Sequence, residues 1–216
     1  MNELNVVVPI KNPRQAKERL APLLSPQQRE DLAWVLIEQT FQFFKAFTHQ
    51  LHVLVVTDCE RVAAKAADHD YAVLREAQAE GETAAVERAT AWSVENGFRS
   101  QVVIPGDMVA LSEADVHRLL ACPRPNPSVI FCPATDDDGT NAILTTPPDI
   151  LRFRFGARSF PGYCAQATAK NVPYTVLRLP SLVLDLDTPE DWQRMKQGPV
   201  SPALRQWMQE WDQPCQ

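Results

Sequence analysis

The chain has 216 residues, of which 45% are hydrophobic and 22% charged, and its formal net charge is −6. This composition predicts a folded domain with one well-filled core and excludes a chain that is disordered throughout. The acidic balance disfavours nucleic acid as a partner, because binding a phosphate backbone requires a concentrated basic surface. No apolar stretch approaches the roughly 20 residues that span a bilayer, so no membrane partner is expected.

The five cysteines show no Cys-x-x-Cys spacing, which indicates free thiols in a reducing compartment rather than a metal site. The N-terminus also lacks the basic start of a signal peptide. A cytoplasmic location is therefore expected. We expect a single domain over residues 1–216, with a C-terminal tail from about 198, and a homodimer is one alternative for the oligomeric state.

Apolar runs of strand length alternate with segments of helical period, the pattern of an α/β fold with a mostly parallel sheet flanked by helices. Strands are expected at 6–8, 51–56, 71–74, 101–104, 129–132, 142–145, 174–177 and 182–185. Helices are expected from 26, at 60–68, at about 82–96, from 112, at about 159–170, from 189 and near the C-terminus. Ser25-Pro26 and Thr188-Pro189 each combine a capping residue with a proline at the first helical position. Ser112 followed by Asp115 predicts an acidic capping box.

Ligands of open parallel sheets bind outside the carboxyl ends of the strands, so the residues after each strand are the informative ones. Here they are cations after the first strand and carboxylates after two later strands: Lys11, Arg14, Lys17, Arg19, Asp107, Asp185 and Asp187. Such groups suit a polyphosphate together with a divalent metal. The first loop has neither a Walker A motif nor a Gly-x-Gly-x-x-Gly fingerprint, and its alternative interpretation is a solvated basic loop.

Asp185 and Asp187 are two residues apart in an expected strand, which places both side chains on one face. Two carboxylates there repel each other unless a metal ion lies between them. The alternative is that Asp187 only supports the turn before Thr188, as Asp107 could support a turn after Gly106. Asp136-Asp137-Asp138 is either a further metal loop or a solvated acidic turn. Gly156 and Ser159 at a helix start form a natural anion site.

Several short motifs occur in a characteristic order along almost the whole chain. They are Val8-Pro9-Ile10-Lys11, Ala16-Lys17-Glu18-Arg19-Leu20, Gly106-Asp107, Asp138-Gly139-Thr140-Asn141-Ala142, Phe155-Gly156-x-x-Ser159 and Leu184-Asp185-Leu186-Asp187-Thr188-Pro189-Glu190-Asp191. In this order they resemble the 2-phospho-L-lactate guanylyltransferase family of coenzyme F-420 biosynthesis.

The resemblance implies a nucleotidyltransferase fold related to glycosyltransferase type A domains, with GTP as the donor. The acceptor would be a small phospho-acid: 2-phospho-L-lactate, phosphoenolpyruvate or 3-phospho-D-glycerate. It implies Mg²⁺ held by Asp107, Asp185 and Asp187, and an acceptor site at Thr140, Asn141, Gly156 and Ser159. The nucleotide would be bound by Lys11, Lys17, Glu82 and Thr83, and the catalytic residues would be Lys17, Arg19 and Asp107.

This chain departs from the family pattern at two positions. Glu82 stands where an asparagine is common, and Tyr163 where a histidine is common, so base recognition and the acceptor pocket are expected to differ. Asn141 and Tyr163 favour 3-phospho-D-glycerate, whose additional hydroxyl needs hydrogen-bonding partners. The rival hypotheses are a sugar-phosphate or molybdopterin nucleotidyltransferase, a glycosyltransferase, and a non-catalytic nucleotide-binding protein.

Overall fold

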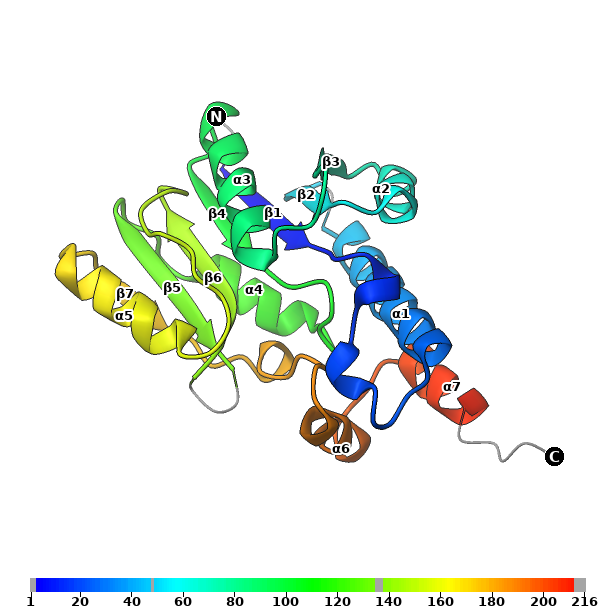
Figure 1. Ribbon diagram of the computed structural model, residues 1–216. Coiled ribbons are helices and arrows are strands. Elements are labelled where there is room, and N and C mark those ends of the chain that lie inside the picture. The colour runs from blue at the N-terminus through cyan, green and yellow to red at the C-terminus, as the bar shows by residue number, and fades with distance from the viewer. Residues whose placement is uncertain (1–2, 48, 135–137, 212–216) are drawn as a thin grey trace.

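The structure is a computed structural model that describes residues 3–47, 49–134 and 138–211. Within these residues one seven-stranded sheet has the order β3-β2-β1-β4-β6-β5-β7 (Figure 1). The strands are β1 (Leu4–Pro9), β2 (His52–Thr57), β3 (Ala72–Arg75), β4 (Ser100–Val103), β5 (Ser128–Pro133), β6 (Thr140–Thr146) and β7 (Tyr174–Val176). Only β6 runs against its neighbours in this sheet, β4 and β5, which confirms the mostly parallel α/β class.

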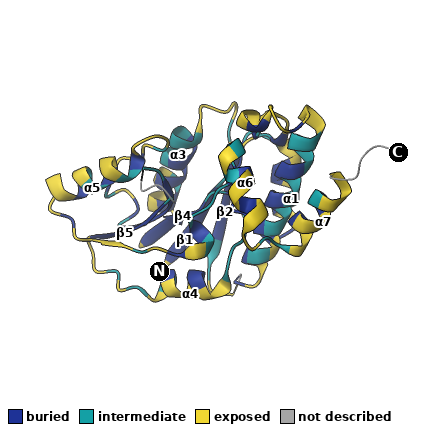
Figure 2. Cartoon of the chain, turned by 90° about the horizontal axis from the view of Figure 1, so that it is seen from below, coloured by how far each residue is buried: buried dark blue, intermediate teal, exposed yellow. Residues whose placement is uncertain are grey.

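Helices cover both faces of the sheet because alternate strand residues point to opposite sides. Val6 and Val8 of β1 belong to a cluster with α1, α2 and α4, whereas Val7 packs with α3 and α5. The five inner strands are accordingly buried, the edge strands β3 and β7 are not, and the helices are exposed on their outer sides (Figure 2). The helices are α1 (Pro26–Lys45), α2 (Glu60–Ala67), α3 (Glu82–Glu95), α4 (Glu113–Ala121), α5 (Ser159–Ala169), α6 (Pro189–Gln197) and α7 (Pro202–Trp211).

A third apolar cluster joins the C-terminal helices to the outer side of α1. Leu32 and Leu36 of α1 meet Trp192 of α6 and Trp207 of α7 there. The expected C-terminal helix therefore exists and packs on the body of the protein through Trp207, while Trp211 is exposed. Among the described helices, none has the length and apolar character that crossing a membrane requires.

All three predicted helix starts are confirmed, with Ser25, Ser112 and Thr188 at the N-caps of α1, α4 and α6. Ser25 and Gln28 make a complete capping box on α1, and Thr188 and Asp191 make one on α6. The capping box predicted for α4 is wrong, because the side chain of Ser112 makes no capping hydrogen bond. The Asp115 carboxylate instead accepts a hydrogen bond from the backbone N–H of Ser181 at 2.9 Å.

The strand predicted at 182–185 is also wrong. A 3-10 turn, η3 (Pro180–Leu182), occupies its start, and the segment then makes a single bridge between Met108 and Asp185. Pro180 has no N–H for a strand ladder, and its fixed φ suits the first position of a turn. The segment therefore crosses the edge of the sheet as a strap rather than joining it.

A buried polar network links β1 to its neighbours at the amino ends of the strands. Asn5 is fully buried; its amide donates to Ser93 Oγ at 2.9 Å, and its Oδ1 lies 2.8 Å from Nδ1 of His52. Burial lowers the pKa of His52, whose ring stacks on Trp92. His52 is thus held neutral, and its Nδ1–H donates to Asn5.

We predict that Asn5→Ala lowers the free energy of unfolding by roughly 2 kcal/mol, because it leaves the buried partners of Asn5 unpaired. Urea denaturation measures the change. The exposed Gln27→Ala, which removes a surface hydrogen bond to Asp31, should alter the same quantity by less than about 0.5 kcal/mol. Equal losses in the two variants would contradict the role of the network.

Candidate active site

A cleft of about 990 Å³ opens along the edge of the sheet where β1, β2 and β4 end. Because β6 is antiparallel, its first residues lie at this same edge. The residues to which the resemblance assigned a role all line the cleft: Lys11, Lys17, Arg19, Glu82, Thr83, Asp107, Thr140, Asn141, Gly156, Ser159, Asp185 and Asp187. The structure thus brings them together, and their individual roles stay predictions. Arg14, the fourth cation of the first loop, does not line the cleft and pairs with Glu30 at 3.6 Å.

The loop that carries Asp107 is fixed by close packing and by α1. A Cβ on Gly106 would lie 2.8 Å from Cγ1 of Ile10, so the two loops touch at a point that only glycine allows. Thr40 Oγ1 donates to the carbonyl of Gly106 at 3.2 Å. Gln39 Nε2 donates to the carbonyls of Met108 and Val109. Support of the site by Gln39 and Thr40 was not predicted from the sequence. The feature that could have indicated it is the presence of two polar side chains on the side of α1 that faces the sheet.

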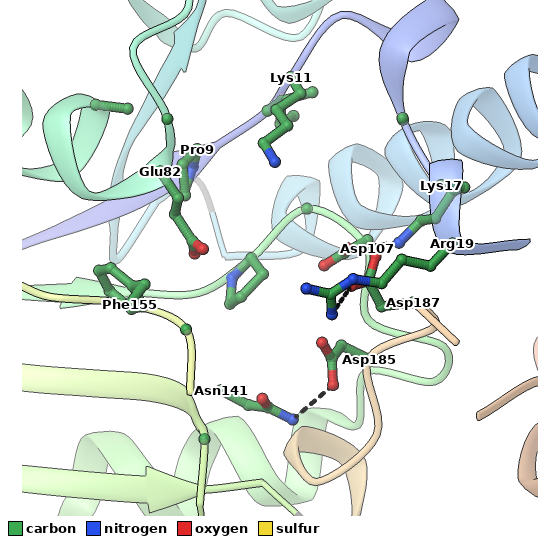
Figure 3. Close-up of a pocket in the computed structure, with 18 of the residues that line it drawn as sticks. Pro9, Lys11, Lys17, Arg19, Glu82, Asp107, Asn141, Phe155, Asp185 and Asp187 are labelled. Atoms are coloured by element: carbon green, nitrogen blue, oxygen red, sulfur yellow. Dashed lines mark hydrogen bonds and ion pairs between the residues drawn. The ribbon is translucent and has the colours of Figure 1, made fainter. Parts of the chain in front are cut away.

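Each of the three predicted metal aspartates has a different protein partner (Figure 3). Lys17 Nζ donates to Asp107 Oδ2 at 2.6 Å, and the Lys17 side chain is only 4% exposed. Arg19 pairs with Asp187 at 3.1 Å from an exposed position. Asn141 donates to Asp185 Oδ1 at 3.4 Å. The cations of the first loop therefore already neutralise part of the acidic edge.

Negative charge remains in excess within the cleft. Burial, reinforced by the charge of Asp107, raises the pKa of Asp185 to about 6. The same two causes raise the pKa of Glu82 to about 7. A bound cation would relieve both carboxyl groups.

The donor set suits a hard cation but is not a complete cage. Among the described residues, no three His, Cys, Asp or Glu side chains are gathered into a group that could hold a metal ion. Mg²⁺ needs only one or two carboxylates when phosphate oxygens and water complete its shell. The mutual repulsion of Asp107 and Asp185 is thus an observation that fits Mg²⁺ bound together with a phosphorylated ligand.

The opposite wall is built by β6 and the start of α5. Ser159 Oγ donates to Thr140 Oγ1 at 3.3 Å, and both residues are buried. Gly156 has a φ of 100°, which favours glycine. The Asp138 carboxylate accepts the backbone N–H of Arg158 at 2.8 Å, so it supports this turn. Asp136 and Asp137, the rest of the acidic run considered as a metal loop, lie outside the described residues.

Tyr163 does not reach the acceptor side as predicted. Its side chain is 1% exposed, its ring stacks on Phe131, and its hydroxyl accepts the backbone N–H of Arg154 at 2.9 Å. Although Tyr163 lies one helical turn after Ser159, its side chain packs in the core and contacts the Phe155 ring edge-on, so it supports the Phe155 loop from behind. Thr83 Oγ1 accepts the N–H of Phe155 at 3.1 Å, so this loop joins the two walls of the cleft.

The far end of the cleft contains further acids that the sequence prediction missed. Asp58 follows β2, and Glu76 follows β3. Arg88 of α3 forms ion pairs with both Glu76 and Glu80. The rule that found Asp107, that a polar residue directly after a strand faces the ligand, applies equally to Asp58 and Glu76.

A sheet edge that gathers cations, carboxylates and the turn at Gly156, on this strand order, has the groups that a nucleotidyltransferase requires. The fold matches a putative nucleotide-diphospho-sugar transferase from Desulfovibrio desulfuricans, with a TM-score of 0.74, 17% identity and 98% and 96% of the two chains covered. It also matches a nucleotidyl transferase from Methanothermobacter, with a TM-score of 0.64, 16% identity and 95% and 100% coverage. Residues 4–196 match the family described as "Guanylyl transferase CofC like", and the chain belongs to this guanylyltransferase family.

Curated relatives carry more specific names. A 3-phospho-D-glycerate guanylyltransferase from Colwellia psychrerythraea is 42% identical over 87% of this chain and 88% of its own length. A phosphoenolpyruvate guanylyltransferase from Rubrobacter xylanophilus is 32% identical over 88% of this chain and 92% of its own length. The predicted family is confirmed.

We predict that Asp185→Asn raises the melting temperature of the metal-free protein at pH 8 by roughly 2–4 °C, the shift that about 1 kcal/mol produces at this size. The pKa of Asp185 rises from 3.8 to about 6 on folding, so the folded state binds more protons and loses stability as the pH rises through this window. Asparagine keeps the acceptor for Asn141 without the charge.

Thermal denaturation followed by fluorescence at pH 8 and near pH 4 measures the gain, which should shrink at the lower pH. Asp149→Asn, at an exposed position, should leave the melting temperature unchanged at both values. A lower melting temperature of Asp185→Asn at pH 8 would contradict the burial penalty.

Proposed function

We propose that this protein transfers GMP from GTP to the phosphate of 3-phospho-D-glycerate and releases pyrophosphate, as a step of coenzyme F-420 biosynthesis. The carrying observation is the set of groups that one cleft brings together. The cations Lys11, Lys17 and Arg19 line it together with the carboxylates Asp107 and Asp185, and with Glu82 and Asn141 (Figure 3). These groups suit a triphosphate whose α-phosphorus meets a second phosphate near Asp107 and Asp185.

The acceptor phosphate is mostly dianionic at neutral pH, because its second pKa is about 6, so it needs no general base. One of its oxygens attacks the α-phosphorus in line, the bond to the bridging oxygen of the β-phosphate breaks, and that oxygen leaves with pyrophosphate. The protein must bring two anions together and stabilise the charge that develops on the leaving group. Lys17 and Arg19, on the loop after β1, would supply that charge.

Asp107, Asp185 and Asp187 would hold Mg²⁺, which supplies charge neutralisation between the two phosphates when bound. The ion pairs of Lys17 with Asp107 and of Arg19 with Asp187 then have a second use. With a cation held by the carboxylates, Lys17 and Arg19 would be available to bind the phosphates of the nucleotide. Asp107 and Lys17 thus orient each other before the substrate binds.

Two observations support 3-phospho-D-glycerate as the acceptor: the polar groups of the acceptor wall, built by β6 and the start of α5, and the name of a relative. With Tyr163 in the core, Asn141 and the Thr140–Ser159 pair are the groups that would bind the hydroxyl and carboxylate of 3-phospho-D-glycerate. The 42% identical relative from Colwellia psychrerythraea, named for this acceptor, supports the same choice. The family membership favours this proposal over sugar, molybdopterin and non-catalytic alternatives. The cytoplasmic location and the oligomeric state stay predictions.

We predict that Lys17→Ala lowers kcat/KM for GTP by about a hundredfold, the effect of removing one donor from a charge-stabilising site. Pyrophosphate release measures the rate, and circular dichroism checks the fold. Lys170→Ala is the matched control, since its ammonium donates only to the carbonyl of Ile150 at an exposed position. Equal, small effects of the two substitutions would remove Lys17 from the phosphate site.

We predict that 3-phospho-D-glycerate gives the dominant product when the three phospho-acids compete at equal concentrations with GTP and Mg²⁺. A site built to bind the additional hydroxyl rejects analogues without it, because its buried polar groups would be left unpaired. Mass spectrometry of the guanosine conjugates measures the ratio. A dominant lactate or enolpyruvate conjugate would overturn the acceptor choice and leave guanylyl transfer intact, whereas no conjugate at all would overturn both.

A further inference from the structure

Asp58 is a polar lining residue of the cleft for which the proposed reaction has no use. It follows β2 directly and lies beside the apolar lining residues Ile10 and Val56. Its turn is fixed: Thr57 Oγ1 accepts the N–H of Cys59 at 3.1 Å, and Arg75 donates to the Asp58 carbonyl at 3.5 Å. The side chain is therefore presented by a defined piece of backbone rather than by a loose loop.

One oxygen of the Asp58 carboxylate has no protein partner. Its Oδ1 is buried without a hydrogen bond to any described residue. Its neighbour Glu76 carries the same charge, which contributes to a raised pKa of Glu76 after the larger effect of burial. Arg88 is engaged by Glu76 and Glu80. A buried acceptor without a donor is costly, and a ligand that brings N–H donors would remove the cost once the side chain turns this oxygen toward the cleft.

The strand order shows which part of a nucleotide meets Asp58. Asp107 follows β4 and Asp58 follows β2, and the two strands flank β1 on opposite sides. Neighbouring strands are about 4.8 Å apart, so the ends of β2 and β4 are separated by about 10 Å across the edge. With the α-phosphate near Asp107, the ribose comes next and the base last. Asp58 thus lies at the distance of the base, on the side away from the acceptor wall of β6.

We propose that Asp58 is the residue that recognises guanine, with its carboxylate accepting hydrogen bonds from the N1–H and the 2-amino group. This rests on the proposed use of GTP. A carboxylate can only accept, and guanine presents two adjacent donors on its Watson–Crick edge. Adenine and cytosine would direct a ring-nitrogen lone pair at the carboxylate, and uracil flanks its N3–H with two carbonyl oxygens. The side-chain torsion of Asp is broad and roughly two-fold, so either oxygen can turn to the base.

The test compares three nucleotides with the wild-type protein and Asp58→Ala. ITP lacks only the 2-amino group of GTP, and 2′-deoxy-GTP lacks only a ribose hydroxyl. We expect the wild type to prefer GTP to ITP by about tenfold or more in kcat/KM, as loss of a charge-assisted hydrogen bond produces. In Asp58→Ala this preference should fall close to one, while the ratio of GTP to 2′-deoxy-GTP stays as in the wild type.

Two further variants keep the test decisive. Asp58→Asn conserves shape and one acceptor, so it should show an intermediate preference for GTP even if the alanine variant folds poorly. Asp68→Asn, an exposed aspartate at the end of α2, should behave as wild type. An unchanged preference for GTP over ITP in folded Asp58 variants would overturn the proposal. A changed ratio of kcat/KM for GTP to that for 2′-deoxy-GTP would also overturn it, because it would assign Asp58 to the ribose. If the wild type uses no GTP with any phospho-acid, the proposed function itself fails.

Discussion

The ion pair between Lys17 and Asp107 joins the two loops on which the cleft depends. A lysine that is almost fully buried must have an anion beside it, and an aspartate that faces other carboxylates must have a cation. Each condition is met by the other residue at 2.6 Å, and Gly106 packed on Ile10 locks the same two loops together. A shift of the loop after β1 therefore moves the acidic edge with it. Nucleotide binding and metal binding are thus expected to be coupled rather than independent events.

The single antiparallel strand gives the cleft its second wall. A wholly parallel sheet would place the first residues of β6 at the opposite edge; reversed, the strand brings Thr140 and Asn141 opposite Asp185. The hydrogen bond from the N–H of Phe155 to Thr83 then ties this wall to the start of α3. The walls are connected at their far side, so the cleft is a preformed trough rather than a gap between two independent bodies.

The sequence predicted the sheet and the members of the cleft well, because both depend on local periodicity and on which residues follow a strand. Asp185 and Asp187 line the cleft as predicted, but the reason for the prediction was wrong. They lie in an irregular strap and not in a strand. The partners of Asp115 and Tyr163 depend on segments far away in the chain, which no local pattern reveals. The hydrogen bonds by which Gln39 and Thr40 of α1 hold the Asp107 loop were not predicted for the same reason.

The contact between Gly106 and Ile10 also limits how this site can change over evolutionary time. A side chain at 106 would meet Ile10 at 2.8 Å, so a substitution there requires the side chain of Ile10 to move or to become smaller. Gly81, which follows β3, has no atom within 4 Å of an added Cβ, and only its φ of 94° restricts it. Under the proposed function, new nucleotide preferences should therefore arise at the β2–β3 end of the cleft more readily than at position 106.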